Sequence, residues 1–262
     1  MAFHERAPGK QLSRHVQCIW IAAQSPGGEG RIVPDGCVEI VFAVDGAFCL
    51  AVEPGRVIRS SPVTVLGLAT RPLGVAYHGR SRLVGVRLTP AGAMRLFARD
   101  TACLGNGAAD GTALVPALAR RLADAVATLV ASGSQGALEH ALQTALDAAP
   151  VVDPRVEQAA SLLHLGSAST SIAAVAREVG LSTRQLDRCF ERWFGISPKL
   201  FERIARFQRA FDLGMRARRG QWALIAAHCG YADQSHLCRD FLEFTQETPD
   251  RMRASLGVAI DV

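Results

Sequence analysis

Short apolar runs punctuated by Gly, Pro and Asp fill the first ninety residues. Each run combines β-branched, aliphatic and aromatic residues, which is the pattern of strands in a small barrel or sandwich. The clearest run follows residues 34–36 (PDG), a predicted turn, after which Val38, Ile40 and Phe42 share one side of a strand. The runs are CIWIAA (18–23), CVEIVFAV (37–44), AFCLAV (47–52), VTVLGLA (63–69) and LVGVRLT (83–89).

From Pro90 onward the apolar spacing becomes helical. Thr89 is a candidate N-cap, and Pro90 suits the first position of a helix. Farther on, an aliphatic stripe recurs every four residues and predicts an amphipathic helix. Two interpretations of the stripe stay open, packing on the β-rich region or a seam between two copies of the chain. The stripe consists of Leu114, Leu118, Leu122, Val126 and Val130.

Residues 147–153 (DAAPVVD) lack apolar periodicity and end next to Pro154, which marks a domain boundary. The predicted fold class is therefore α+β with two domains. A β-rich barrel or sandwich with accessory helices occupies 1–146, a linker occupies 147–153, and an all-helical domain occupies 154–262.

Two helical hairpins in the C-terminal part share one design. In the first, a short helix ends at Gly180, and Ser182 with Gln185 forms a predicted capping box for the next helix. In the second, Gly230 ends a short helix and Asp233 caps its successor. Each hairpin has the helix-turn-helix pattern. A single such pattern is weak evidence for DNA binding, because any helical hairpin with a glycine turn imitates it.

Residues 197–213 (SPKLFERIARFQRAFDL) join the two hairpins as one predicted helix. Ser197 is its N-cap, Pro198 takes the first helical position, and Phe207 and Phe211 lie on one face. Roughly 17 residues at 1.5 Å per residue span about 25 Å. A rigid spacer of this length suits two units that enter successive major grooves, about 34 Å apart.

Three stretches of the C-terminal part carry a family resemblance: IAAVAREVGLSTRQLDRCFERWFGISPKLF (172–201), RIARFQRAFDL (203–213) and IAAHCGYADQSHLCRDFLEFTQETPDRMR (225–253). Through them, residues 154–253 resemble the DNA-binding domain of AraC/XylS-type bacterial transcription regulators. TQETP at 245–249 departs from the commoner glycine-containing turn, and Met252 stands where an aromatic residue is usual. The resemblance implies a sequence-specific DNA-binding regulator and not an enzyme.

The resemblance also implies which residues face DNA. The second helix of each unit would enter a major groove, where Arg can read guanine, Gln adenine and Asp cytosine. For Asp187, an ion pair that only orients a neighbouring arginine is the alternative. The implied base-reading residues are Arg184, Asp187, Arg188, Gln234, Ser235, Cys238 and Arg239. The implied phosphate contacts are Ser182, Lys199, Arg206 and His236.

The N-terminal part carries a second resemblance. VPDGCVEIVF (33–42), TRPLG (70–74) and GVRLTPAGAMRLF (85–97) resemble an uncharacterised cupin-like domain of such regulators. It implies a β-barrel that binds a small effector, followed by helices that dimerise, with no known ligand. Polar or aromatic residues beside the predicted strands are candidates for the effector pocket. They are Trp20, Asp35, Cys37, Glu39, Arg71 and His78.

Composition narrows the class of protein. With 49% hydrophobic and 20% charged residues the chain is globular, and no apolar run approaches the roughly 20 residues that span a bilayer. The N-terminus lacks the apolar core of a signal peptide, so we expect a cytoplasmic protein. His4, His15 and His78 are isolated and neither HxH nor G-x-S-x-G occurs, so no metal, cofactor or catalytic site is predicted.

The net charge of +5 permits binding to a polyanion such as double-stranded DNA. A homodimer is favoured because paired sites multiply affinity, and RNA polymerase is open as a further partner. The seven cysteines form no CxxC pair and are expected to be reduced. The alternative function is a thiol sensor, in which an oxidant or an electrophile modifies Cys37 or Cys49 and thereby changes DNA binding.

Overall fold

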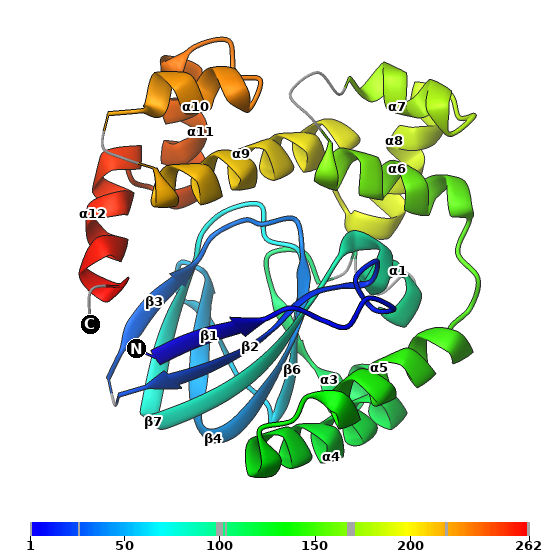
Figure 1. The fold of residues 1–262 in the computed structure, drawn as a ribbon, viewed down its shortest axis with the longest axis vertical. Coiled ribbons are helices and arrows are strands. Elements are labelled where there is room, and N and C mark those ends of the chain that lie inside the picture. The colour runs from blue at the N-terminus through cyan, green and yellow to red at the C-terminus, as the bar shows by residue number, and fades with distance from the viewer. Residues whose placement is uncertain are drawn as a thin grey trace.

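The computed structural model describes residues 2–25, 27–97, 102, 104–166, 171–217 and 220–260. Within these ranges the N-terminal part contains eight strands of one antiparallel sheet (Figure 1). The sheet has the order β1-β2-β7-β4-β6-β8, with β3 paired to β7 and β5 paired to β4. The strands are β1 (Ala2–Arg6), β2 (Val16–Gln24), β3 (Glu29–Ile32), β4 (Val38–Glu53), β5 (Arg56–Arg59), β6 (Val63–Leu66), β7 (Leu73–Leu88) and β8 (Ala108–Asp110).

The two longest strands, β4 and β7, form the centre of the sheet. The runs 37–44 and 47–52, expected as separate strands, merge into β4. The register of β4 against β7 shifts on both sides of Asp45, and Gly46 adopts a φ of 71°. This backbone conformation favours glycine, and it bends β4 without ending it. The bend helps the sheet to curl, so that one face becomes concave.

Helices α1 (Pro90–Phe97), α3 (Gly111–Leu114), α4 (Pro116–Ser132) and α5 (Gly136–Ala148) follow or interrupt the strands. The N-cap prediction at Thr89 is confirmed, since its hydroxyl accepts a hydrogen bond from the Gly92 amide at 3.2 Å. One apolar face of the sheet, including Ile40 and Val86, packs with α1, α4 and α5 into a single core. The accessory helices therefore belong to the core of the N-terminal part.

The aliphatic stripe of residues 114–130 lies in this core. Leu122 and Val126 are buried, and Leu114, Leu118 and Val130 are partly buried against the same cluster as the sheet. Val115 separates α3 from α4, so the stripe continues across a break. Packing on the β-rich region is therefore the interpretation that the structure confirms.

The C-terminal part is all-helical, as predicted. Its helices are α6 (Pro154–Leu165), α7 (Ile172–Glu178), α8 (Thr183–Phe194), α9 (Pro198–Arg216), α10 (Trp222–His228), α11 (Gln234–Thr245) and α12 (Pro249–Ile260). Residues 149–153, between α5 and α6, have neither helix nor strand and fall within the predicted linker. The α+β fold class, a cupin-like antiparallel sheet with accessory helices followed by helix-turn-helix units, is confirmed.

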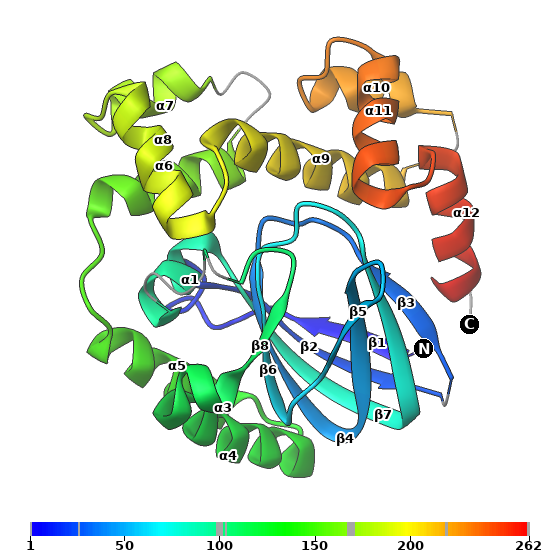
Figure 2. The same cartoon turned by 180° about the vertical axis from the view of Figure 1, so that it is seen from behind.

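Helix α9 lies across the sheet, with α6, α7 and α8 at one end and α10, α11 and α12 at the other (Figures 1 and 2). One apolar cluster runs through α6 to α11 and includes Leu68 and Met94 from the N-terminal part. The sheet and the helical part are therefore in direct apolar contact.

Candidate DNA interface and interdomain cavity

The first helix-turn-helix unit consists of α7 and α8. Gly180 has a φ of 70°, so the chain turns between the helices at a position that favours glycine. The Ser182 hydroxyl accepts a hydrogen bond from the Gln185 amide at 3.2 Å, and the Gln185 side chain accepts one from the Ser182 amide at 2.8 Å. The predicted capping box is thus confirmed, and it fixes where α8 begins.

The outward face of α8 carries Arg184, Asp187 and Arg188, all exposed, opposite buried Leu186 and Phe190. Among the described residues, none of these three charged side chains forms an ion pair or a side-chain hydrogen bond. Asp187 is therefore not paired with either arginine. All three groups are free to contact a groove.

The second unit consists of α10 and α11. Gly230 has a φ of 78° between them, and the Asp233 carboxylate accepts a hydrogen bond from the His236 amide at 2.6 Å, which confirms the predicted cap. Leu237 and Phe241 on α11 are buried, as predicted. On the outward face three predicted base-reading residues are exposed and one, Cys238, is half-buried. The exposed three are Gln234, Ser235 and Arg239.

Aromatic contacts hold α9 to α8 and α11, the second helices of the two units. The ring of Phe201 lies 5.3 Å from that of Phe190 on α8, and the ring of Phe207 lies 5.1 Å from that of Phe241 on α11. Such edge-to-face pairs add to the burial of the rings. The separation of α8 and α11 is therefore set by a packed helix and not by a tether.

A buried carboxylate reinforces the second contact. Asp240 on α11 is 1% exposed and accepts a hydrogen bond from Arg203 Nε of α9 at 2.8 Å. Arg206 lies near the same carboxylate, at 4.0 Å, and its guanidinium sits over the Tyr231 ring at 4.8 Å. Arg206 is thus engaged inside the protein, and this position does not favour its predicted phosphate contact.

The other predicted phosphate contacts occupy different settings. Ser182 serves as the N-cap of α8, and Lys199 is exposed in the first turn of α9. His236 is half-buried, with its ring edge-on to Tyr231 at 5.1 Å. Lys199 is the one whose side chain is fully available to an incoming phosphate.

A cavity of about 330 Å³ lies between the sheet and α9. This volume is at the lower end of the range for small-molecule sites. Gln208, Phe211 and Asp212 of α9 form part of its wall, so both parts of the chain are needed to enclose it. Five aromatic side chains line it: Phe3, Trp20, Phe48, Tyr77 and Phe211.

Arg87 of β7 is the centre of the charged wall of the cavity. Its guanidinium pairs with Glu39 at 2.7 Å, Asp35 at 3.3 Å and Glu5 at 3.2 Å. Glu39 also accepts a hydrogen bond from Trp20 Nε1 at 3.2 Å. Burial alone lowers the pKa of Arg87, but the charges of Glu39 and Asp35 outweigh burial and raise that pKa, so Arg87 stays protonated.

Three of the six predicted pocket residues line this cavity: Trp20, Asp35 and Glu39. Cys37 lies behind the wall, where its buried S–H donates to Gln17 Oε1 at 2.8 Å. Arg71 lines a separate cavity of about 220 Å³ and donates to the Val52 carbonyl at 2.6 Å. His78 lines neither cavity. Cys37, Arg71 and His78 therefore lie outside the lining of the interdomain cavity.

The lining residues that the sequence analysis did not predict include Arg87 and the three residues of α9. Arg87 could have been recognised from the sequence, because it is the only charged residue in the run LVGVRLT (83–89). Gln208, Phe211 and Asp212 could not, since their place in the wall depends on how α9 docks on the sheet.

The surroundings of Cys37 bear on the thiol-sensor alternative. Cys37 is 3% exposed, and burial, followed by the negative charge of Asp35, raises its pKa well above the usual range. A sensor thiol needs a lowered pKa and access to oxidant. Cys37 has neither, so nothing at this residue supports redox sensing.

Within the described ranges, no group of three or more His, Cys, Asp or Glu side chains is placed to hold a metal ion. In the same part of the chain, none of the helices combines the length and the apolarity that crossing a bilayer requires.

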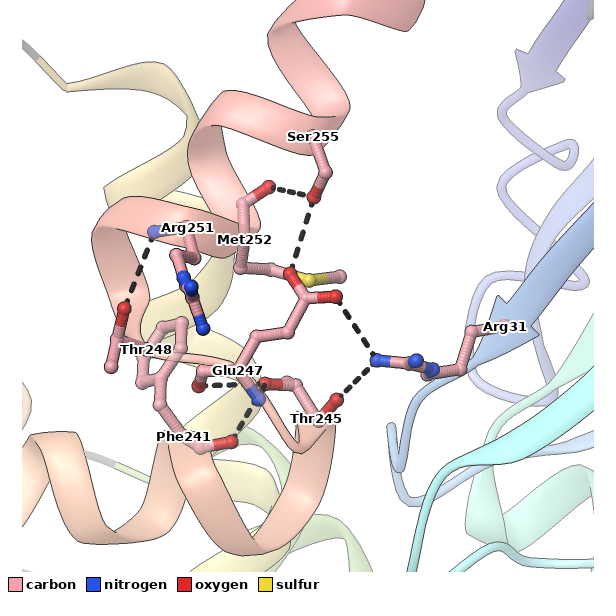
Figure 3. A network of polar contacts seen from close by, with 8 residues as sticks. All are labelled: Arg31, Phe241, Thr245, Glu247, Thr248, Arg251, Met252 and Ser255. Carbon is pink, nitrogen blue, oxygen red and sulfur yellow. Dashed lines mark hydrogen bonds and ion pairs between the residues drawn. The ribbon is translucent and has the colours of Figure 1, made fainter.

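Arg31 of β3 connects the sheet to the second helix-turn-helix unit (Figure 3). Its Nη1 donates to the Thr245 carbonyl at the end of α11 at 2.6 Å and pairs with Glu247 at 3.2 Å. Near the other end of α9, Arg14 pairs with the buried carboxylate of Glu157 on α6 at 2.9 Å. The helical part is thus tied to the N-terminal part at two places.

Comparisons with known proteins agree with this geometry. Residues 175–255 match the model of a helix-turn-helix domain, and residues 4–110 match that of a domain of unknown function, DUF6597. ToxT from Vibrio cholerae has 10% sequence identity and a TM-score of 0.55, over 97% of this chain and 98% of that one. At this identity the likeness shows a shared two-part fold. No curated protein matches the chain.

Two other solved structures are similar. ToxT from Vibrio cholerae O395, bound to (E)-4-(8-methylnaphthalen-1-yl)but-3-enoic acid, has 11% identity and a TM-score of 0.53, over 98% of this chain and all of that one. A transcriptional regulator with an AraC-type DNA-binding domain from Chromobacterium violaceum has 27% identity and a TM-score of 0.36, over 38% of this chain and 90% of that one.

The paired units on α9, with the helix-turn-helix match across residues 175–255, define a DNA-binding transcriptional regulator. More specifically, the helix-turn-helix match lies within the part of the chain that resembles the DNA-binding domain of AraC/XylS-type regulators. The N-terminal part of the chain is of the DUF6597 type.

Proposed function

We propose that this regulator reads two successive major grooves with α8 and α11, and that a small molecule in the interdomain cavity controls its binding to DNA. One observation carries the proposal: α9 both separates the two helix-turn-helix units and forms a wall of the cavity. A molecule in the cavity would contact Phe211 and Asp212, close to the end of α9 that holds the second unit. A molecule in the cavity would therefore contact α9, the helix that sets the distance between the two helix-turn-helix units.

The ToxT structures add support for an effector. One of them is bound to an unsaturated fatty acid and another to (E)-4-(8-methylnaphthalen-1-yl)but-3-enoic acid. We carry over to this chain only the binding of a small organic molecule, because the shared fold does not specify ligand chemistry.

The proposal includes the residues that face DNA. Lys199 contacts phosphate. The residues that contact bases are Arg184, Asp187 and Arg188 on α8 and Gln234, Ser235, Cys238 and Arg239 on α11. We also propose a cytoplasmic homodimer that contacts RNA polymerase, with domains at 1–146 and 154–262 joined by the linker 147–153. A dimer would bind a repeated site more tightly than a monomer, through effective concentration.

Selection of sheared genomic DNA by the purified full chain tests the proposal. We expect enrichment of a site with two short blocks about one helical turn apart. Arg188→Ala should weaken binding by roughly 1–3 kcal/mol and relax the sequence preference within one block. Arg120→Ala, which removes an exposed arginine from α4, is the matched control and should leave the selection unchanged. Equal behaviour of the two variants would contradict base reading by α8.

A further inference from the structure

The walls of the interdomain cavity carry more negative than positive charge. Four carboxylates line it, against the guanidinium groups of Arg31 and Arg87. Arg87 alone faces three of the carboxylates, so one positive charge meets three negative charges on the sheet side. The four carboxylates are Glu5, Asp35, Glu39 and Asp212.

Arg31 does not offset this excess. Its guanidinium is directed to the Thr245 carbonyl and to the carboxylate of Glu247, both on the helical part (Figure 3). Because Glu247 adds a negative charge of its own, the surroundings of the cavity stay net negative when Arg31 is included.

Asp212 brings a further carboxylate to the α9 side. Among the described residues, its one hydrogen-bond donor is the Gln208 amide of the same helix, at 3.1 Å. Withdrawal of water by the surrounding protein raises the pKa of Asp212, the charges of Arg216 and Arg87 oppose this rise, and the smaller effects of Glu5 and Asp35 add to it. Because Asp212 forms no ion pair among the described residues, its carboxylate adds negative charge to the α9 side of the cavity.

Aromatic rings complete the lining. The rings of Phe3 and Trp20 lie 5.8 Å apart, and Phe48, Tyr77 and Phe211 line the same volume. The faces of such rings carry negative electrostatic potential and attract cations. A cavity with aromatic walls and excess carboxylates suits an organic cation better than an anion.

We propose that the interdomain cavity binds a cationic ligand, an amine or amidine with a small apolar body. Its charged group lies between the carboxylates around Arg87 and that of Asp212, and its apolar body contacts Trp20 and Phe211. Because it contacts carboxylates on the sheet and on α9 together, the ligand strengthens the contact between the two parts. This inference specifies the ligand class of the cavity in the proposed function and rests on that proposal.

Three probes of similar size test the charge preference: 2-phenylethylamine as cation, 3-phenylpropionate as anion and 2-phenylethanol as neutral control. Isothermal titration calorimetry on the full chain measures each affinity. We expect the cation to bind about tenfold or more tightly than the anion. Preferential binding of the anion, or no binding of any probe at millimolar concentration, would overturn the inference.

Two variants locate the charge. Asp212→Asn should weaken binding of the cation about tenfold and leave the affinity for the neutral probe unchanged. Asp124→Asn removes an exposed carboxylate from α4 and is the control. Equal cation affinity in Asp212→Asn and the unaltered chain would reject the role of Asp212. The thermal midpoint of each variant shows that it is folded.

The two proposals fail separately. If genomic selection yields a bipartite site but the amine does not bind, regulation of transcription stands and the ligand class is wrong. If the amine binds but Arg188→Ala leaves DNA binding intact, the ligand class stands and base reading by α8 is wrong.

Discussion

Trp20 owes its position in the cavity wall to the absence of a side chain at Gly85. The two residues are cross-strand neighbours on β2 and β7, and a Cβ at Gly85 would overlap the indole ring. The ring therefore lies where its Nε1 reaches Glu39. Trp20 and Glu39 could be predicted as pocket residues because both lie in strand-like runs. Their contact could not, since it depends on the register of three strands.

The consequence of this packing can be measured. Gly85→Ala should displace the indole and lower the free energy of unfolding by about 1–3 kcal/mol, as overpacking of cores does. Gly74→Ala is the matched control on the same strand, because its Cβ would lie 3.5 Å from Ala51 Cβ, an ordinary contact. Urea unfolding of both variants checks the prediction. A similar loss of stability in the two variants would show that overlap with Trp20 is not the cause.

Among the elements, α9 is the one on which both functional regions depend. Its end near the second unit contains Gly214, where a Cβ would overlap the ring of Trp222 on α10. The missing side chain allows α10 to approach α9 closely. This contact, together with the ring of Phe207 against Phe241, fixes the orientation of the second unit.

Gly214→Ala should therefore change the spacing of the two units. We expect it to push α10 away from α9 and to weaken binding to a bipartite site about tenfold. With the spacing changed, the two units can no longer both fit their DNA blocks at the same time. Electrophoretic mobility shift with both blocks present, and with each block scrambled in turn, measures the effect. The variant should lose the most affinity on the intact site. Gly136→Ala, at the start of α5, is the control, since its Cβ would meet only the Ser134 hydroxyl at 3.7 Å.

The sequence predicts the elements whose bounds depend on neighbouring residues. It fails where a structure depends on contacts between segments that are far apart in the chain. The caps at Ser182, Asp233 and Ser197 were predictable because each acts within one turn of its own helix. The union of two apolar runs into β4 was not, because Asp45 and Gly46 look like a turn until β7 pairs with both sides of them. The contribution of α9 to the cavity wall was not predictable either, because it depends on how α9 docks on the sheet.

On the scale of the whole molecule, the sheet and the helical part are held together by few polar contacts. Arg31 joins β3 to the segment after α11, and Arg14 joins the loop before β2 to α6. Apolar contact through Leu68 and Met94 lies at the α6 and α8 end, within the helical core. Among these contacts, Arg31 makes the polar connection at the end of the second unit.

Arg31→Ala should loosen that end without unfolding either part. The side chain of Arg31 is 37% exposed, so we expect the loss of roughly 1 kcal/mol or less, typical of solvent-screened pairs. Hydrogen exchange of residues 245–252 and of β3 should rise about fivefold, while exchange in α4 stays unchanged. Arg59→Ala, an exposed arginine on β5, is the control. Unchanged exchange near residue 247 would mean that apolar contacts alone hold the second unit.

The shared wall of the cavity also limits how regulators of this kind can be recombined. A chimaera that keeps residues 1–153 and takes its remaining helices from another regulator would exchange Phe211 and Asp212 together with the recognition helices. Such a hybrid would recognise a new DNA sequence. Because part of the cavity wall is exchanged as well, its preference among small molecules would also change. A hybrid that keeps α9 together with the N-terminal part would keep the lining of the interdomain cavity. The aromatic contacts from α9 to the new counterparts of α8 and α11 would then have to be rebuilt.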